Sequence, residues 1–527
     1  MEKKSKKLQQ GFIQGIITIM MSQVLIKVVG FVYRIYLTNK PGFGDTGNGF
    51  INVSSTIFNI LLAIASVGVP TAISKLVSEK VAVKDYKEAH RVFKVALGMF
   101  MMIGIVCSLL LYFSSGFIAS NIALLPKTEI LIKILAPAIF FVSISAVIRG
   151  YFTGYQEMRA TSISQLLEQI FNCILTILIV TMLTGSSTEE MAAGSQLAST
   201  LSILFSTAYL IIFYRFKKKI IDKNIKRTEE TKPIDVKEIV KSILYISIPL
   251  SFASIISTVG KLIDNSTIIS GLESIGYLKD EATRLLGMLT GRIDIIINLP
   301  LALNVAFSIA LVPAIARAIK LKEYKEAHRK VGFSILITIL ITIPCVVALL
   351  TLAGPILGLV YNSIDSQAII LLQVSTIIIL FMLITQTLSG ILQGYGKIRV
   401  PAIGLFFGII GKTIVNIIFV RIPSINIMGS VLGSIASQVI SFGICYFVFV
   451  KTVKMNMSFK KYILKPIIAG VLMAIVCILG YKLLGIILPS KIAVLGTLGI
   501  ASLTYGVAIL KMKVVSAKEI KSIVQRG

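Results

Sequence analysis

The sequence contains 527 residues, of which 55% are hydrophobic and 15% are charged, and its mean hydropathy is +0.89. A soluble chain carries about a quarter of its residues charged, so this composition excludes an ordinary globular protein and is typical of a polytopic membrane protein. The net charge of +29 would suggest nucleic-acid binding in a soluble chain, but cytoplasmic loops of membrane proteins carry Lys and Arg, so we expect no nucleic-acid partner.

Long apolar runs follow one another along the chain, and a membrane-spanning helix needs about 20 such residues. The first run follows a basic start and continues past Lys27 and Arg34 without a small-residue cleavage site, so we interpret it as a retained helix and not as a signal peptide. The runs lack the alternation of a β-barrel. The fourteen predicted spans are residues 11–38, 48–74, 92–117, 129–152, 161–184, 191–214, 240–270, 284–316, 331–353, 367–392, 399–421, 425–450, 462–484 and 488–510.

Basic residues are distributed unevenly between the two sides of these spans. When the N-terminus is placed in the cytoplasm, the cytoplasmic segments hold forty of the 53 Lys and Arg residues, and the outside loops hold seven. Because cytoplasmic loops carry the excess of positive charge, this bias predicts a multi-pass protein of the plasma membrane with both termini in the cytoplasm.

Two sequence motifs occur twice, about 240 residues apart. The hexapeptide Tyr-Lys-Glu-Ala-His-Arg covers residues 86–91 and again residues 324–329, and it contains the only two histidines of the chain. A Gly-x-x-x-Gly-Tyr-x-x-x-Arg pattern begins at Gly150 and recurs at Gly390. Two motifs at one spacing indicate a duplicated unit, and the six spans between the copies predict a parallel repeat. We expect both hexapeptides to lie in cytoplasmic loops that anchor the topology.

The duplication predicts an all-α membrane protein with 14 transmembrane helices, arranged as two parallel-repeat six-helix lobes plus two C-terminal helices. The predicted N-lobe covers residues 1–216 and the C-lobe covers residues 240–453. A polar, mixed-charge cytoplasmic linker, residues 217–239, joins them. Residues 454–527 contain helices 13 and 14 and a cytoplasmic tail.

The sequence contains no pattern typical of an enzyme or of a cofactor site. It lacks a nucleophile elbow, a phosphate-binding loop with Gly-Lys-Ser/Thr and a zinc-binding HExxH helix. The five cysteines each lie in an apolar run without metal-ligand spacing, so we interpret them as small core residues. We therefore expect a protein that is not an enzyme and that needs neither a cofactor nor a metal.

Charged residues inside the spans are the best candidates for function, because a Lys or Arg at the centre of a membrane helix costs roughly 2.5–3.5 kcal/mol. Lys27 and Arg34 are seven residues apart, so two helical turns place them on one face, although Arg34 also lies near enough to the outer end to reach the headgroups. Arg292 lies near the outer third of the eighth span and is free to face a cavity. Lys261 and Asp264 either form a structural ion pair or belong to a substrate site.

Four further polar residues lie inside spans. Gln165 and Glu168 are expected to bond to neighbouring helices, whereas Lys412 and Asn416 share a face, which leaves a role in function open. Intramembrane cations outnumber the acids, which favours an anionic substrate, because Arg pairs bidentately with phosphate and Lys acts as a mobile point charge. A cation-coupled drug antiporter would instead need a buried carboxylate, which Glu168 or Asp264 would have to supply.

Four segments resemble the signature segments of a known family. They are Gly30-Phe31-Val32-Tyr33-Arg34 and residues 68–76, 149–155 and 310–315. Over nearly its whole length the chain resembles the polysaccharide biosynthesis branch of the multidrug/oligosaccharidyl-lipid/polysaccharide flippase superfamily, and within it the group of stage V sporulation protein B and the lipid II flippases. The resemblance implies a fourteen-helix, V-shaped transporter with a cationic cavity between two lobes and alternating access.

The resemblance also implies roles for individual residues. The first-helix arginines of the family correspond to Lys27 and Arg34, its eighth-helix arginine to Arg292, and its loop aspartate after the first span to Asp45. Its second-helix arginine has no counterpart, because residues 48–74 contain no Lys or Arg, which leaves room for glycans other than lipid II. In lipid II flippases helices 13 and 14 form a groove for the lipid tail, and the extra pair here fits that role.

These observations predict a flippase that moves an undecaprenyl-pyrophosphate-linked saccharide, with lipid II as the first candidate, to the outer leaflet for cell-wall synthesis. Lys27, Arg34 and Arg292 would hold the pyrophosphate. The full set of candidate substrate-binding residues is Lys27, Arg34, Asp45, Lys261, Asp264 and Arg292. The expected partners are the lipid-linked glycan and membrane lipids, with cell-wall synthesis enzymes as further candidates.

Three alternatives stay open at this point. The first is a flippase for another lipid-linked glycan, such as a capsular, teichoic or spore-cortex precursor. The second is a cation-coupled drug antiporter, and the third is a non-transporting scaffold for a cell-wall synthesis complex.

Overall fold

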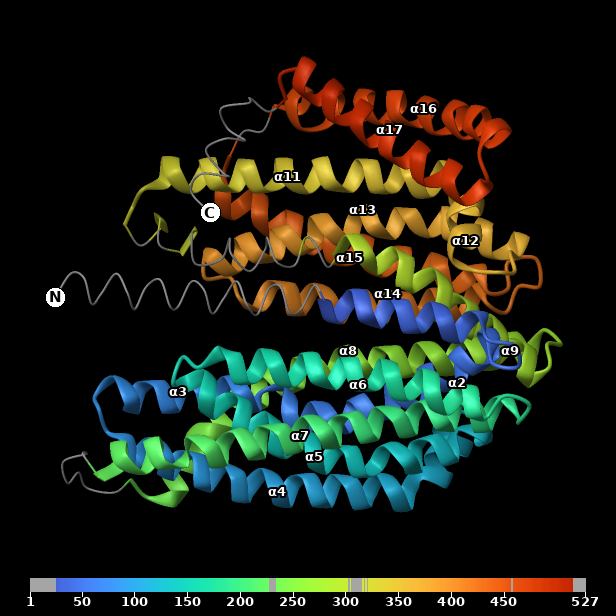
Figure 1. The fold of residues 1–527 in the computed structure, drawn as a ribbon. Helices are drawn as coiled ribbons and strands as arrows, with labels where there is room; N and C mark the ends of the chain where they lie inside the picture. The colour runs from blue at the N-terminus through green and yellow to red at the C-terminus, as the bar shows by residue number, and fades with distance from the viewer. Residues whose placement is uncertain are drawn as a thin grey trace. The chain divides into compact units, whose positions relative to one another are not determined.

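The computed structural model describes residues 25–226, 234–301, 304, 315–316, 318–319, 321–455 and 458–514, except for the side chain of Ala253. All regular structure in these residues is helical, as Figure 1 shows. The chain divides into two compact units, Met1–Gly287 and Met288–Gly527.

The first unit contains helical residues 25–39 and eleven further elements in its described part. They are α2 (Gly44–Leu62), the π-helical turn η1 (Ala63–Val67), α3 (Val69–Ala82), α4 (Tyr86–Phe117), η2 (Ile118–Ile122), η3 (Pro126–Thr128), α5 (Glu129–Gly154), α6 (Met158–Met182), α7 (Thr188–Lys226), α8 (Val236–Ser274) and α9 (Lys279–Met288).

The second unit begins with the π-helical turn η4 (Leu289–Ile293) and helical residues 294–301. Its other described elements are α11 (Tyr324–Thr351), α12 (Ala353–Val360), α13 (Ser366–Gly394), α14 (Arg399–Phe419), α15 (Met428–Val453), η5 (Lys460–Leu464), α16 (Lys465–Ile487) and α17 (Ser490–Lys511). A buried cluster that includes Leu336, Met473 and Tyr505 packs the last two helices against α11, beside which they lie in Figure 1.

Twelve helices in the described part are long and apolar enough to cross a membrane. They coincide with twelve of the fourteen spans expected from the sequence, so the all-helical, multi-pass architecture is confirmed. The other two expected spans, residues 11–38 and 284–316, lie only partly within the described residues. The total of fourteen therefore stays a prediction.

Aspartate residues at the N-cap position explain where some of these helices begin. The carboxylate of Asp85 accepts a hydrogen bond from the backbone N–H of Glu88 at 3.0 Å. At the start of α13, the carboxylate of Asp365 accepts one from the backbone N–H of Gln367 at 2.9 Å. An Asp at this position satisfies one of the backbone donors that the first helical turn leaves unpaired. The cap at Asp85 starts α4 one residue later, at Tyr86.

The two hexapeptides therefore do not lie in loops, which corrects the expectation from the sequence. They form the first turns of α4 and α11, because each follows a tight turn in which a lysine, Lys84 or Lys322, takes a left-handed φ of 60°. The basic character that suggested loops belongs to the ends of these helices. The shared turn supports the duplication.

The repeated glycine pattern is a helix-packing motif in the first unit. A Cβ atom at Gly150 would lie 2.9 Å from the Cα of Pro70, and one at Gly154 would lie 2.8 Å from the Cβ of Val77. Only glycine therefore lets α5 approach α3 this closely. A large apolar cluster around the fully buried Tyr151 continues this contact to α4 and α7.

The first compact unit includes α8, although the sequence assigns residues 240–453 to the C-lobe. A Cβ at Gly68 would overlap the carbonyl oxygen of Ser247, so the backbone between η1 and α3 touches α8 directly. Near the beginning of α2, a Cβ at Gly49 would likewise overlap the backbone carbonyl oxygen of Thr283 in α9. The predicted lobe boundaries stay a prediction, but α2 and α8 enclose the candidate site.

Candidate functional site

The candidate site is a cavity of about 310 Å³ in the first unit, between α2 and α8. Its described lining consists of Arg34, Asn52, Ser55, Thr56, Asn59, Leu62, Val67, Ser254, Thr258 and Lys261. Two of these residues are cations, six are neutral polar residues, and none is acidic. A cavity with this lining suits an anion that also carries hydrogen-bonding groups.

Side-chain amides hold the two walls of the cavity together. Asn52 of α2 donates a hydrogen bond to Asn265 of α8 at 3.0 Å, and Asn265 donates to Thr56 at 3.4 Å. Gln196 of α7 fixes the back of α2 by donating to the hydroxyl of Ser55 at 3.0 Å. Such bonds between membrane helices contribute about 1 kcal/mol each to stability. Together they hold the cavity wall in place before a ligand binds.

Arg34 reaches the cavity from the helix of residues 25–39. Its guanidinium donates to the amide oxygen of Asn48 at 3.2 Å. The described part of the chain shows no ion pair of Arg34 with a carboxylate. Arg34 therefore brings a positive charge to the cavity that no described acidic side chain compensates.

Lys261 joins Arg34 at this cavity from α8, although the two residues are 227 positions apart in the sequence. The structural ion pair between Lys261 and Asp264, one of the two expectations from the sequence, is not found among the described residues. Lys261 is exposed and lines the cavity, where water or a ligand can solvate its charge, so it does not need a partner on the same helix.

Lys27, Asp45 and Asp264 are absent from the described lining of this cavity. Lys27 is exposed, one helical turn before Gly30, whose Cβ position lies 3.4 Å from the amide nitrogen of Gln169 in α6. Asp45 is buried in the first turn of α2, where Gly287 of α9 packs against its backbone carbonyl. Their roles at the substrate stay predictions.

Arg292 is buried within the second unit, with 6% of its surface exposed. Its guanidinium donates to the carbonyl oxygen of Ser363 at 2.6 Å and lies 5.1 Å from the ring centre of Tyr361. The hydroxyl of Tyr361 in turn donates to the carbonyl oxygen of Gly291 at 3.2 Å. These contacts tie η4 to the segment after α12, so Arg292 has a structural role here, and its expected contact with substrate stays a prediction.

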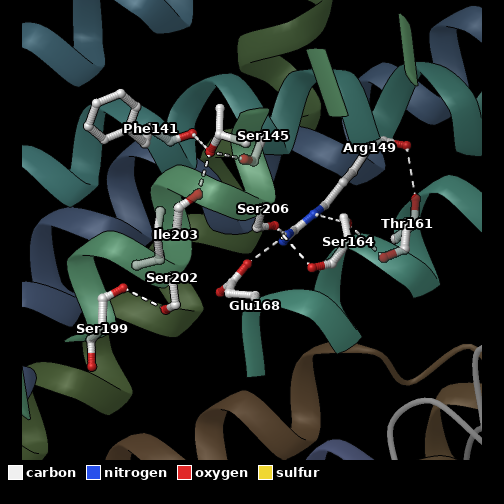
Figure 2. A network of polar contacts seen from close by, with 11 residues as sticks. Phe141, Ser145, Arg149, Thr161, Ser164, Glu168, Ser199, Ser202, Ile203 and Ser206 are labelled. Carbon is white, nitrogen blue, oxygen red and sulfur yellow. Dashed lines mark hydrogen bonds and ion pairs between the residues drawn. The ribbon is translucent and has the colours of Figure 1, made fainter. Parts of the chain in front are cut away.

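Arg149 is a half-buried cation near the end of the predicted span 129–152, and it was not among the predicted site residues. Figure 2 shows its side chain pointing from α5 toward Glu168 of α6 and Ser206 of α7. It pairs with the carboxylate of Glu168 at 2.7 Å and donates to the hydroxyls of Ser206 at 2.9 Å and Ser164 at 3.0 Å.

The prediction that Glu168 bonds to a neighbouring helix is thereby confirmed. The sequence contained a signal for this pair. Glu168 is an acid inside a span with no cation three or four residues away, so its counter-charge had to come from another helix. Of the second polar pair, Asn416 is fully buried in α14, where Gly433 of α15 packs against its side-chain oxygen. This places Asn416 in helix packing in the second unit.

A larger hollow of about 940 Å³ lies at the beginning of α11. It is lined by residues of both charges, including Lys322, Glu323, Glu326 and Lys330. Glu326 lies 3.0 Å from Arg329 and 3.8 Å from Lys330. The charges there largely compensate each other, so the smaller cavity is the better candidate for an anion site.

Comparison with known proteins identifies relatives of this chain. The sequence matches the model of the family described as polysaccharide biosynthesis protein over residues 12–319, and the MatE model over residues 294–418. It is 24% identical over 433 residues to stage V sporulation protein B of Bacillus subtilis (strain 168), covering 82% of each chain. It is also 24% identical over 448 residues to the lipid II flippase MurJ of the same strain, covering 82% of this chain and 81% of MurJ.

Solved structures share the fold. A lipid II flippase MurJ in an inward closed conformation superimposes with a TM-score of 0.69 at 17% identity, covering 93% of this chain and 98% of that one. An inward-facing multidrug resistance MATE family transporter of the MOP superfamily gives a TM-score of 0.66 at 14% identity, covering 83% and 100%. At these identities the likeness establishes the fold alone.

Proposed function

The chain belongs to the polysaccharide biosynthesis protein family, and we propose that it is a flippase for an undecaprenyl-pyrophosphate-linked saccharide. The relatives include a lipid II flippase and a multidrug resistance transporter, which supports transport across a membrane as the general function of this chain. Lipid II is the first candidate substrate, because one relative is named a lipid II flippase. With both termini in the cytoplasm, the substrate would move to the outer leaflet for cell-wall synthesis.

The observation that carries this proposal is the meeting of Arg34 and Lys261 in one polar cavity without a described acidic lining residue. A pyrophosphate carries several negative charges, and the planar guanidinium of Arg and the point charge of Lys are suited to bind it. The amides of Asn52 and Asn59, and the hydroxyls around them, are the kind of groups that bond to sugar hydroxyls. Lys27, Asp45, Asp264 and Arg292 stay proposed contributors.

One other kind of substrate competes with lipid II within this function, and one other class of function competes with the flippase. A different lipid-linked glycan, such as a capsular, teichoic or spore-cortex precursor, has the same anionic head, and the absence of Lys and Arg from residues 48–74 leaves room for it. The match to the MatE model favours drug antiport as the second class of function. Against Glu168 as the carboxylate of an antiporter, its charge is already compensated by Arg149 at 2.7 Å, which leaves Asp264 as the candidate.

The test uses a bacterial strain depleted of its own lipid II flippase and supplied with variants of this chain. We expect the parent chain to restore growth and the delivery of lipid II to the outer leaflet, and Arg34→Gln and Lys261→Gln each to lower that delivery at least tenfold. Lys279→Gln is the control, because Lys279 pairs with Glu273 at 3.6 Å and is absent from the described cavity lining.

Three outcomes would contradict parts of the proposal. If both cavity variants deliver lipid II as well as the parent does, the cavity is not the pyrophosphate site. If the parent fails with lipid II but delivers a teichoic or capsular precursor, the substrate is the other glycan. If it delivers neither and instead confers drug resistance, the antiporter is correct.

A further inference from the structure

Two arginines in the first unit are held by different kinds of partner. Arg149 lies 2.7 Å from the carboxylate of Glu168, which compensates its charge. Arg34 lies 3.2 Å from the neutral amide oxygen of Asn48. Because an amide accepts a hydrogen bond without carrying a net charge, Asn48 fixes the position of Arg34 and leaves its charge available.

The neighbours of Asn48 determine which way its amide group points. Its nitrogen donates to the carbonyl oxygen of Gly44 at 3.2 Å and to the hydroxyl of Thr38 at 2.8 Å. A carbonyl oxygen can only accept and a guanidinium can only donate, so the nitrogen must face Gly44 and the oxygen must face Arg34. Asn48 is only 1% exposed, so water does not compete for these bonds.

The same bonds close a ring across the turn between two helices. The hydroxyl of Thr38 accepts from Asn48 and donates to the backbone carbonyl of Arg34 at 2.9 Å. Asn48 thereby ties the last turn of the first described helix to the first turn of α2, and it holds the guanidinium at its far end. The flexible arginine side chain is therefore ordered before a ligand arrives, which lowers the entropy cost of binding.

We propose that Asn48 is a positioning residue that presents Arg34 to the cavity without neutralising it, so that the anionic head of the ligand supplies the counter-charge. This inference rests on the proposed function. The guanidinium has five N–H donors, and the structure assigns one of its nitrogens, Nη1, to Asn48. The remaining donors allow the bidentate contact that a phosphate group accepts.

The decisive comparison is between two substitutions of the same residue. Asn48→Asp places a carboxylate where the amide oxygen now faces Arg34, and the ligand must then compete with it. Asn48→Ala removes every bond of the side chain but leaves the charge of Arg34 uncompensated. We therefore expect Asn48→Asp to weaken binding of undecaprenyl pyrophosphate at least tenfold, and Asn48→Ala to weaken it less, by a few-fold.

The measurement is the affinity of the purified full chain in detergent for undecaprenyl pyrophosphate, with the thermal unfolding midpoint recorded for each variant. Asn172→Asp of α6 is the matched control, because it makes the same change at a half-buried amide that accepts from Thr176 and Ser199 and is absent from the described cavity lining. It should bind as the parent does.

A purely structural role for Asn48 predicts the opposite order, because Asn48→Ala loses more bonds than Asn48→Asp. That order, with binding following the loss of thermal stability, would overturn the inference. Arg34→Gln separates this from a failure of the proposed function. If Arg34→Gln binds like the parent, the proposed function fails; if it loses binding while Asn48→Asp does not, only the role of Asn48 fails.

Discussion

Gly68 lies so close to the carbonyl oxygen of Ser247 that no side-chain atom fits between them. This contact joins the end of η1 to α8, beside a cavity whose lining includes Val67 and Ser254. The first prediction concerns Gly68→Ala, which we expect to force the two helices apart and to lower the free energy of unfolding by about 1–3 kcal/mol.

The control for that substitution is Gly98→Ala in α4, where an added Cβ meets no atom within 4 Å. Alanine favours a helix over glycine by roughly 0.5–1 kcal/mol, so this variant should be unchanged or more stable. Thermal unfolding in detergent measures both. Equal midpoints for the two variants would show that the contact at Gly68 is not tight.

The second prediction concerns the ion pair of Arg149 and Glu168. Glu168→Gln leaves the guanidinium, which is only 13% exposed at the side chain, without its counter-charge, and we expect a loss of about 1–3 kcal/mol of unfolding free energy. Glu157→Gln is the control, because its pair with Lys217 at 3.6 Å is more exposed and should contribute less than about 1 kcal/mol. Chemical denaturation of the two variants tests this, and a larger loss at Glu157 would refute it.

The third prediction uses the two copies of the hexapeptide as each other's control. Glu88 is 3% exposed and accepts a hydrogen bond from the backbone N–H of Ile234 at 3.3 Å, whereas Glu326 is half-buried and contacts Arg329 and Lys330. We expect Glu88→Ala to cost about 1–3 kcal/mol and Glu326→Ala less than about 0.5 kcal/mol. Comparable shifts in the unfolding midpoint would mean that the burial of the first copy has no energetic consequence.

The fourth prediction is that Arg292→Lys destabilises the second unit although it keeps the charge. A lysine cannot reproduce the planar contact with Tyr361 or the paired donors that reach Ser363. We expect a loss of about 1–2 kcal/mol. Arg329→Lys, at an exposed ion pair with Glu326, is the control and should leave the unfolding midpoint unchanged. If Arg292→Lys also leaves the midpoint unchanged, Arg292 has no structural role.

The spans were predictable because a membrane imposes a local rule. Backbone groups inside the bilayer must bond within their own helix, so a run of apolar residues identifies a span without reference to any other part of the chain. The Gly-x-x-x-Gly pattern at Gly150 could be located for the same reason, but its partners on α3, Pro70 and Val77, became visible only in the fold.

The pairing of charges could not be predicted with the same success. The sequence placed Lys27 and Arg34 on one face of a helix, yet only Arg34 is among the described residues that line the cavity, and its companion there is Lys261 of α8. Arg149 was not a predicted site residue, and only the approach of α6 and α7 to α5 gives it Glu168 and Ser206 as partners.

The hexapeptides show most directly what each level determines. Identical residues begin α4 and α11, and the sequence by itself predicted a duplication from them and determined that each lies beside an apolar span. Only the tertiary structure decided that Glu88 and His90 are buried while Glu326 and His328 are not. The physical reason is that hydropathy and helix caps act within a few residues, whereas burial and charge pairing depend on which distant helix packs against the site.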